Sequence, residues 1–362
     1  MIITLGGGTE FIMTVLNNNG YFAAANSRGG FVSFFKDIFR NGKLDYLYII
    51  KGGSGTGKSR LMREIAHAAE CVGEEVEYFY CSSDPRSLDG IILKGRGVGI
   101  IDGTAPHSEE PNLPGCADEI INLGEFWDSN LLRKNKAIIS ELTETKRKLY
   151  QNAYSYLAAA GQANEVANLL TIPALKKEKL DSWAKRTVQR FGESKNPCEE
   201  IRLTSAISYM GECDTGEFYN SADTRFVLCD TAHISPFVFA SLRRAFFERG
   251  CSVSLSFSAL DTGALNGIFV KGERVSFTEF GDTARNAVIN TDRFLDKEIY
   301  RQNRTKIRFL RKSASAMVES ASETMKQIYE VHSEIEKIYA SAMDFEAKEK
   351  YTKKLIKTVL GK

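Results

Sequence analysis

The sequence has few of the features that mark a membrane, secreted or zinc-binding protein. None of its 362 residues lies in an apolar run that approaches the roughly 18–20 residues needed to span a bilayer. Its seven cysteines include no Cys-x-x-Cys pair, and its four histidines occur singly, so neither a disulfide framework nor a zinc site is indicated. No basic residue precedes Arg28, so the positive segment of a secretory signal is missing. We therefore expect reduced thiols, a cytoplasmic location and no membrane partner.

The chain also lacks an excess of either charge. It has 48 basic and 46 acidic side chains, a net charge of +2, so the whole molecule is not an electrostatic binder of nucleic acid. One local exception is residues 301–312, which hold six basic residues and no acid. This run is typical of a solvated helix face; the alternatives are a lid that contacts phosphate and a nucleic-acid patch. We do not expect nucleic acid as a partner.

A glycine-rich motif follows the first strongly apolar segment. Residues 46–50 (YLYII) have the length and composition of a buried parallel strand, and Leu61 and Ile65 lie downstream at helical spacing. The segment between them fits G-x-x-x-x-G-K-[ST], in which glycines let backbone N–H groups surround phosphate at a helix N-terminus. The sequence therefore predicts a P-loop (Walker A) that binds ATP through Gly52, Gly53, Ser54, Gly55, Thr56, Gly57, Lys58 and Ser59.

Three further roles follow from this motif. Lys58 would reach the β- and γ-phosphates, and the Ser59 hydroxyl would bind Mg²⁺. Asp102 ends the apolar run of residues 98–101, so we predict that it is the second Mg²⁺ ligand, a Walker-B acid on a neighbouring strand. His107, in the loop that follows, could orient or deprotonate a nucleophile, although a single loop histidine is more typical of the surface. The predicted catalytic residues are Lys58, Asp102 and His107.

The chain contains an internal repeat. An offset of 177 aligns residues 73–98 with residues 250–275, and nine of these 26 positions are identical. An offset of 168 aligns the later residues 121–126 with 289–294. We therefore predict an extension at residues 1–20, a P-loop domain with a helical extension at residues 21–195, and a second copy with long C-terminal helices at residues 196–362.

The second copy has lost the motif. Residues 229–236 (CDTAHISP) contain none of its glycines, and the offset places Ser235 opposite Lys58. Asp230 would put a negative charge where phosphate should lie, and Glu279 stands opposite Asp102. The loop of residues 103–107 has no counterpart. We predict that the second copy keeps the fold without binding nucleotide.

Long charged segments with helical patterning follow each copy. The first runs over residues 128–190 with interruptions near Gly161 and Pro173, and the second runs over residues 294–360. Neither has a clean heptad seam. The expected fold is α/β: a P-loop NTPase-type parallel sheet flanked by helices, tandemly duplicated, each copy with a helical extension.

Five segments together resemble a bacterial family of tandem P-loop ATPase-like proteins that are described as ATP-binding. They are the P-loop and residues 78–84 (YFYCSSD), 88–90 (LDG), 102–107 (DGTAPH) and 119–124 (EIINLG). The resemblance spans nearly the whole chain after about residue 20. Members of this family often carry a P-loop in both halves, and the second half of this chain departs from that pattern. The resemblance implies ATP binding and hydrolysis, without a substrate.

We therefore expect Mg²⁺-dependent ATP binding, with hydrolysis or phosphoryl transfer, at the first-half P-loop, and a regulatory or structural second half. One alternative is a small-molecule or nucleoside kinase, in which the loops of Asp84 and His107 line an acceptor pocket. Another is a nucleotide-sensing protein with little turnover. The expected partners are a nucleoside triphosphate and an unassigned acceptor or protein.

Overall fold

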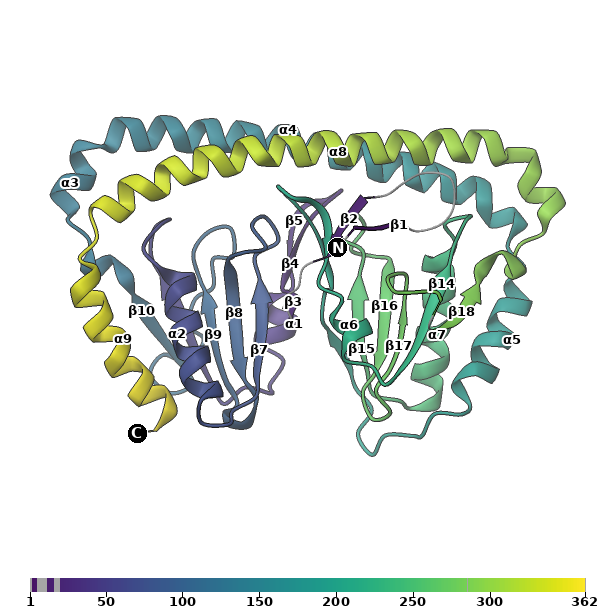
Figure 1. Cartoon of the computed structure of the whole chain (residues 1–362), viewed down its shortest axis with the longest axis horizontal. Helices are drawn as coiled ribbons and strands as arrows, with labels where there is room; N and C mark the ends of the chain where they lie inside the picture. The colour runs from purple at the N-terminus through teal and green to yellow at the C-terminus, as the bar shows by residue number, and fades with distance from the viewer. Residues whose placement is uncertain (1, 5–11, 16–19, 285, 362) are drawn as a thin grey trace.

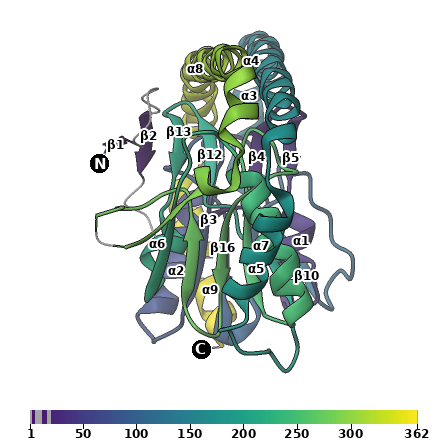
Figure 2. The same ribbon diagram turned by 90° about the vertical axis from the view of Figure 1, so that its right-hand side faces the viewer.

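The computed structural model describes residues 2–4, 12–15, 20–284 and 286–361. Two six-stranded sheets stand side by side, and a pair of long helices spans both of them along one edge (Figure 1). Viewed along this pair, the two helices lie next to each other at one end of the sheets (Figure 2).

The two sheets have the same strand order, counted from each outer edge. The first contains, in order, β10 (Asp118–Asn122), β6 (Tyr46–Lys51), β9 (Val98–Asp102), β8 (Leu88–Leu93), β7 (Val76–Tyr80) and β3 (Tyr21–Phe22). The second contains β18 (Ala287–Asn290), β14 (Thr224–Cys229), β17 (Val275–Thr278), β16 (Leu265–Val270), β15 (Val253–Phe257) and β11 (Glu199–Ile201). β7 and β15, β8 and β16, and β9 and β17 all begin 177 residues apart, which confirms the predicted duplication.

The prediction of a parallel sheet is wrong in one respect, because both sheets are mixed. β8 pairs antiparallel with β7 and with β9, and the remaining pairs of the described first sheet are parallel. β16 occupies the same reversed position in the second sheet. The reason is the short connections on either side of β8, because parallel neighbours need a crossover of a dozen or more residues. The carboxyl ends of β6, β7 and β9 still meet at one edge.

Helices cover both faces of the first sheet. α2 (Lys58–Glu70) packs its apolar stripe on one face, and α1 (Phe35–Phe39) covers the other. The alternation of buried residues along β6 serves both sides, since Ile50 faces α2 and Ile49 faces α1. In the second half, α7 (Ser235–Arg249) follows β14 as α2 follows β6, and α6 (Glu217–Asn220) precedes β14 as α1 precedes β6.

Short hairpins lie where the two halves meet. β4 (Ala24–Ser27) pairs with β5 (Gly30–Ser33), and β12 (Ser205–Ser208) pairs with β13 (Gly211–Asp214) in the second half. Within the predicted N-terminal extension the structure describes residues 2–4, 12–15 and 20. The first two segments form β1 (Ile2–Thr4) and β2 (Ile12–Val15), and β2 pairs with β13. The extension thus contacts the second half of the chain.

The helical segments form the long pair, α4 (Lys136–Thr171) and α8 (Lys297–Ser341), and three shorter helices, α3 (Ser129–Lys134), α5 (Lys177–Val188) and α9 (Phe345–Leu360). The predicted interruption near Gly161 is wrong, because α4 continues through it. A Cβ at Gly161 would lie 2.5 Å from the Arg28 Cβ, so the glycine allows close packing. Near Pro173 the helix ends as predicted, in the 3₁₀ turn η3 (Ile172–Ala174).

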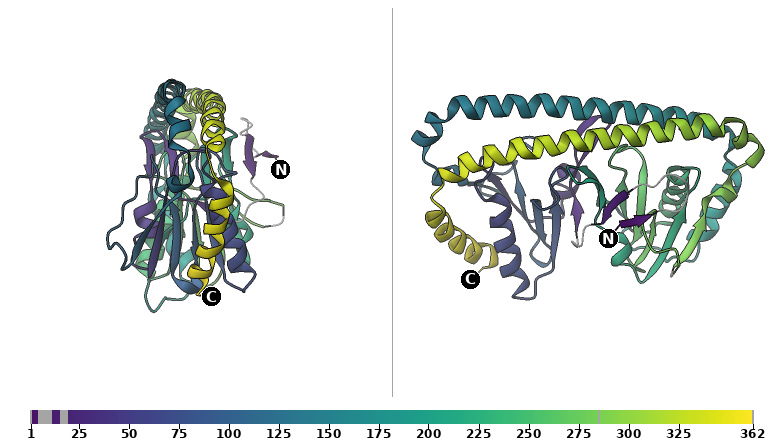
Figure 3. Two further views of the ribbon diagram at one scale, coloured as in Figure 1. Left: turned by 90° about the vertical axis from the view of Figure 1, so that its left-hand side faces the viewer. Right: turned by 45° about the horizontal axis from the view of Figure 1, so that its top comes forward.

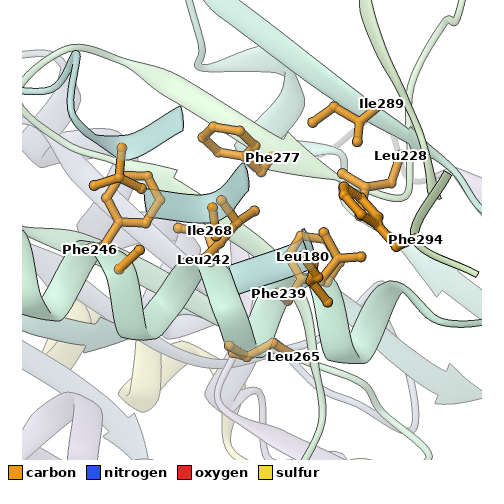
Figure 4. Packing of buried hydrophobic residues seen from close by; sticks show 14 of the residues in the cluster. Leu180, Leu228, Phe239, Leu242, Phe246, Leu265, Ile268, Phe277, Ile289 and Phe294 are labelled. Atoms are coloured by element: carbon orange, nitrogen blue, oxygen red, sulfur yellow. The ribbon is translucent and has the colours of Figure 1, made fainter. Parts of the chain in front are cut away.

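The helical extensions are exchanged between the two halves. α4 and α8 run antiparallel, so each carries its following helix to the opposite sheet (Figure 3). α5 packs against α7, where Leu180 lies beside Phe239 and Leu242 in the second-half core (Figure 4). α9 packs against α2, and Leu355 and Val359 join the core of the first half. Each half thus supplies a helix that covers the other.

Alanines line the contact between the two long helices. Ala153 and Ala160 of α4 share a buried cluster with Ala314 and Ala321 of α8. Such small side chains let two helices approach closely without a heptad seam. In the part of the chain that the structure describes, we find no helix with the length and apolar character of a membrane span.

Candidate functional site

The loop between β6 and α2 has the geometry of an anion site. We call residues 52–57 the glycine-rich loop. Gly55 and Gly57 have φ of 72° and 83°, in the left-handed region that glycine adopts without a steric penalty. Gly57 is the N-cap of α2 and offers no side chain to its first amides. These amides and the positive end of the helix dipole therefore favour an anion in the loop.

Lys58 and Asp102 lie together at this loop. The Lys58 ammonium donates to the carbonyl oxygens of Gly52 (3.1 Å) and Gly53 (2.9 Å), and its Nζ is 3.6 Å from the Asp102 Oδ2. Asp102 ends β9, in register with Ile50 of β6, so the predicted neighbouring strand is confirmed. Burial raises the pKa of Asp102, although the Lys58 charge opposes this. A cation bound nearby would stabilise the charged form of a carboxyl in this environment.

Ser59 and Asp102 offer the oxygen donors that Mg²⁺ takes in proteins. The Ser59 hydroxyl lies in the first turn of α2 and accepts a hydrogen bond from the Leu88 N–H at 3.0 Å. The described residues contain no group of three His, Cys, Asp or Glu side chains able to hold a metal by themselves. Mg²⁺ usually takes one or two protein ligands and completes its shell with phosphate and water, so this donor set fits it when phosphate is bound.

His107 is buried beside Asp102 and does not lie on the surface. Its Nε2 is 3.0 Å from Asp89 Oδ2, and its ring stacks on Phe35 with centroids 4.3 Å apart. Burial lowers the pKa of His107, but the carboxylates of Asp89, Asp102 and Glu109 together outweigh this effect, Asp89 most of all, and the pKa is raised overall. Asp89 lies in β8, and sequence reasoning noticed it only within a family motif. The two side chains form a buried acid–base pair.

The exchanged end of α8 covers the glycine-rich loop. A Cβ on Gly53 would lie 2.6 Å from the Tyr339 ring, and a Cβ on Gly55 would meet the carbonyl oxygen of Glu336. Burial raises the pKa of the Glu336 carboxyl, while the Gly55 N–H favours its charged form. Glycine is thus required here both for φ and for the approach of α8. Glu336 and Tyr339 lie far from the motif in sequence, and no sequence signal indicated them.

Two open cavities lie on the other side of Tyr339. One, of about 380 Å³, is bounded by Trp127 and Tyr339, and by Arg133 and Lys136 on its polar side. The other, of about 490 Å³, lies between Trp127 and the start of α9. Both are lined by residues that follow the carboxyl end of β10 and by residues near the end of α8.

In the second half, the corresponding position is filled by the chain itself. The Asp230 carboxylate accepts hydrogen bonds from the Ile234 N–H (3.0 Å) and the Ser235 N–H (2.5 Å) at the start of α7. As the alignment predicts, an acidic side chain lies at the position that corresponds to the glycine-rich loop. The Ser235 hydroxyl donates to Glu279, which matches the contact between Lys58 and Asp102.

The basic run of residues 301–312 lies over this second half. Arg301, Arg304 and Arg308 are exposed. Arg311 turns inward and donates to the side chains of Asn164 and Asn168, at 2.9 and 2.5 Å, and to the His233 carbonyl at 3.4 Å. The run is therefore a solvated helix face with one inward arginine, and it does not lie over the glycine-rich loop.

Comparison of the chain with protein-family models, with curated proteins and with solved structures returned no match.

Proposed function

We propose that the first half binds a nucleoside triphosphate, taken to be ATP, with Mg²⁺ at the glycine-rich loop, and that it cleaves the terminal phosphate. The observation that carries this proposal is the loop itself. Its left-handed glycines, the uncapped start of α2, and Lys58 beside Asp102 form an anion site at the carboxyl edge of the sheet. In the second half Asp230 occupies the equivalent position, so we assign one nucleotide site to the chain.

Each residue has a distinct role in this proposal. Lys58, which now donates to two loop carbonyls, turns its ammonium to the β- and γ-phosphate oxygens. Ser59 and Asp102 hold Mg²⁺, which supplies positive charge against the phosphate oxygens. The cavity of about 380 Å³ beside Trp127 and Tyr339 has room for the base and ribose.

Nucleotide binding would also move α8. Tyr339 contacts Gly53, and the Glu336 carboxyl faces the Gly55 N–H. A phosphate at the loop would compete with this carboxyl for the same amide and repel its charge. We therefore expect α8 to shift when the triphosphate binds, and this shift gives the second half a regulatory role.

A second candidate is phosphoryl transfer to an acceptor other than water. The buried pair of His107 and Asp89 favours it, because it lies beside Asp102 and is shielded from bulk water. In this reading, His107 takes the proton from the acceptor hydroxyl, while Asp89 holds the imidazole and stabilises its charged form. A screen of hydroxyl-bearing metabolites that finds no increase in ATP consumption would favour hydrolysis.

The test compares Lys58→Ala with Lys94→Ala, an exposed lysine at the opposite end of the sheet. Calorimetry with ATP, with and without Mg²⁺, should show binding in the wild type and in Lys94→Ala, and at least about 10-fold weaker binding in Lys58→Ala. Phosphate release is then measured in the same samples. Equal ATP affinity in all three proteins would contradict the proposal. Tight binding with no phosphate release, with or without acceptors, would instead indicate a nucleotide sensor.

A further inference from the structure

The helix pair brings two basic side chains to the space above the glycine-rich loop. Lys146 lies on α4 and His332 on α8, and the Lys146 Nζ is 3.3 Å from the His332 Nδ1. Both side chains are partly buried between the helices and the first half. Neither belongs to the motif, and each comes from a different copy of the repeat.

These two groups face the same space as Lys58. Burial lowers the pKa of Lys146, and the Lys58 charge lowers it further, while Glu336 opposes both effects. Burial, Lys146 and Lys58 together lower the pKa of His332 to about 4. Two cationic groups, Lys58 and Lys146, therefore lie near each other here, together with the neutral imidazole of His332 and the Glu336 carboxyl. Like charges held together in a partly buried space destabilise one another unless an anion lies between them.

The neighbouring acids do not neutralise Lys146 directly. In the part of the chain that the structure describes, the Lys146 ammonium forms no ion pair, and its polar side-chain contact is the imidazole of His332. Glu336 is closer to His332, at 3.6 Å between Oε1 and Nε2. A basic side chain without a directly bound acid, next to an anion-binding loop, is typical of a phosphate site.

The second half shows the same arrangement with its anion in place. There, Asp230 fills the loop, and Arg311 reaches across from the helix pair to the loop carbonyl of His233. Burial lowers the pKa of Arg311, and the charge of Asp230 opposes this effect. Asn164, which binds Arg311, matches His332 at the offset of 168. The second half thus contains an anion from its own loop and a cation from the helices, whereas the first-half loop supplies no acid of its own and its Gly55 N–H faces the Glu336 carboxyl of α8.

We propose that Lys146, positioned by His332, binds the terminal phosphate of the nucleoside triphosphate held in the glycine-rich loop. This inference rests on the proposed function and adds that the helix pair completes the site. Lys146 donates to the γ-phosphate oxygens from the side opposite Lys58, so it distinguishes a triphosphate from a diphosphate. His332 accepts a hydrogen bond from Lys146 through its neutral Nδ1 and holds the ammonium in place.

The experiment measures ATP and ADP affinities, with Mg²⁺, for the wild type, Lys146→Gln, Lys146→Arg and Lys148→Gln. Lys148 is the matched control, because it lies on the same helix with a 68% exposed side chain. We expect Lys146→Gln to weaken ATP binding by about 10- to 100-fold and to change ADP binding by less than about 2-fold. Lys146→Arg should recover most of the loss, and Lys148→Gln should match the wild type.

His332→Asn gives a second route, because asparagine stands at the matched position of the second half. This variant should weaken ATP binding more than ADP binding, and to a smaller extent than Lys146→Gln. It keeps the proposal testable if Lys146→Gln does not fold. Equal losses for ATP and ADP, or no loss, would overturn this inference while Lys58→Ala still supported the proposed function. A wild type that binds neither nucleotide would overturn both.

Discussion

The pH dependence of stability tests the environment of Glu279, which lies beside the second-half loop. Glu279 directly follows β17, the strand that corresponds to β9, and the Ser235 hydroxyl donates to its carboxyl. Burial, reinforced by the negative charges of Asp230, Glu212 and Asp214, raises the pKa of Glu279 to about 8 from an ordinary value of 4.5. The folded protein therefore holds a neutral carboxyl at pH 7, while the unfolded chain holds a carboxylate. A neutral Glu279 is consistent with Ser235, and not a lysine, at the position that corresponds to Lys58.

The sign of the pH effect follows from this difference. A carboxyl with a raised pKa contributes stability that is fully present below pH 4.5 and is lost as the pH rises through about 8. Each pKa unit corresponds to about 1.4 kcal/mol, so the full shift is equivalent to about 5 kcal/mol. A carboxyl that turns toward water as it ionises recovers part of this penalty, and we expect the folded protein to lose about 2 kcal/mol between pH 5 and 8.

Glu279→Gln removes this loss and keeps an acceptor for Ser235. We expect the variant to match the wild type at pH 5 and to exceed its free energy of unfolding by about 2 kcal/mol at pH 8. Urea titrations at pH 5, 6.5 and 8 measure the difference, and Glu298→Gln, on an exposed helix position, serves as the control. The pKa of Asp214 is also raised, but Asp214 is present in all three proteins, so its contribution to the pH dependence cancels when they are compared. A difference between Glu279→Gln and wild type that did not change with pH would refute the assignment of a neutral Glu279.

Three other changes test the first half. Asp89→Asn should lower the pKa of His107 and reduce phosphate transfer at least about 10-fold, because the Asp89–His107 pair acts on the nucleophile. ATP affinity should be retained, so kcat and calorimetric affinity are measured together. A parallel loss of kcat and affinity would argue against this role of the pair. Gly55→Ala should destabilise the fold by about 1–3 kcal/mol, since φ is 72° and the new Cβ meets α8; thermal unfolding that matched the wild type would show that α8 does not rest on the loop. Leu355→Ala should reduce the free energy of unfolding by about 2–4 kcal/mol, because this side chain is buried in the first-half core; denaturant titration measures it, and a change below about 1 kcal/mol would indicate that α9 is loosely attached.

The parts of the fold that sequence reasoning predicted are those with a local signal. The apolar run before Gly52, the helical spacing after Ser59 and the acid at the end of β9 each lie within a few residues of the motif. The repeat was equally visible, because β7, β8 and β9 keep their spacing in the second half.

The parts that were missed depend on contacts between distant segments. The apolar pattern of β8 is the same for either strand direction, so the sequence did not reveal that β8 is reversed. Gly161 suggested a helix end, but close packing against Arg28 keeps it in α4. Lys146 and His332 look like ordinary polar positions of long helices, and only the pairing of α4 with α8 places them above the loop.

The exchange of helices has a consequence for how the molecule comes apart. Because α9 completes the core around α2, and α5 completes the core around α7, separating the halves would expose apolar surface on both sides at once. If the backbone were cut between the two copies, the two fragments would therefore stay associated without a covalent bond, because each supplies a helix to the core of the other. Denaturation should pass from native to unfolded without a state in which one half survives alone.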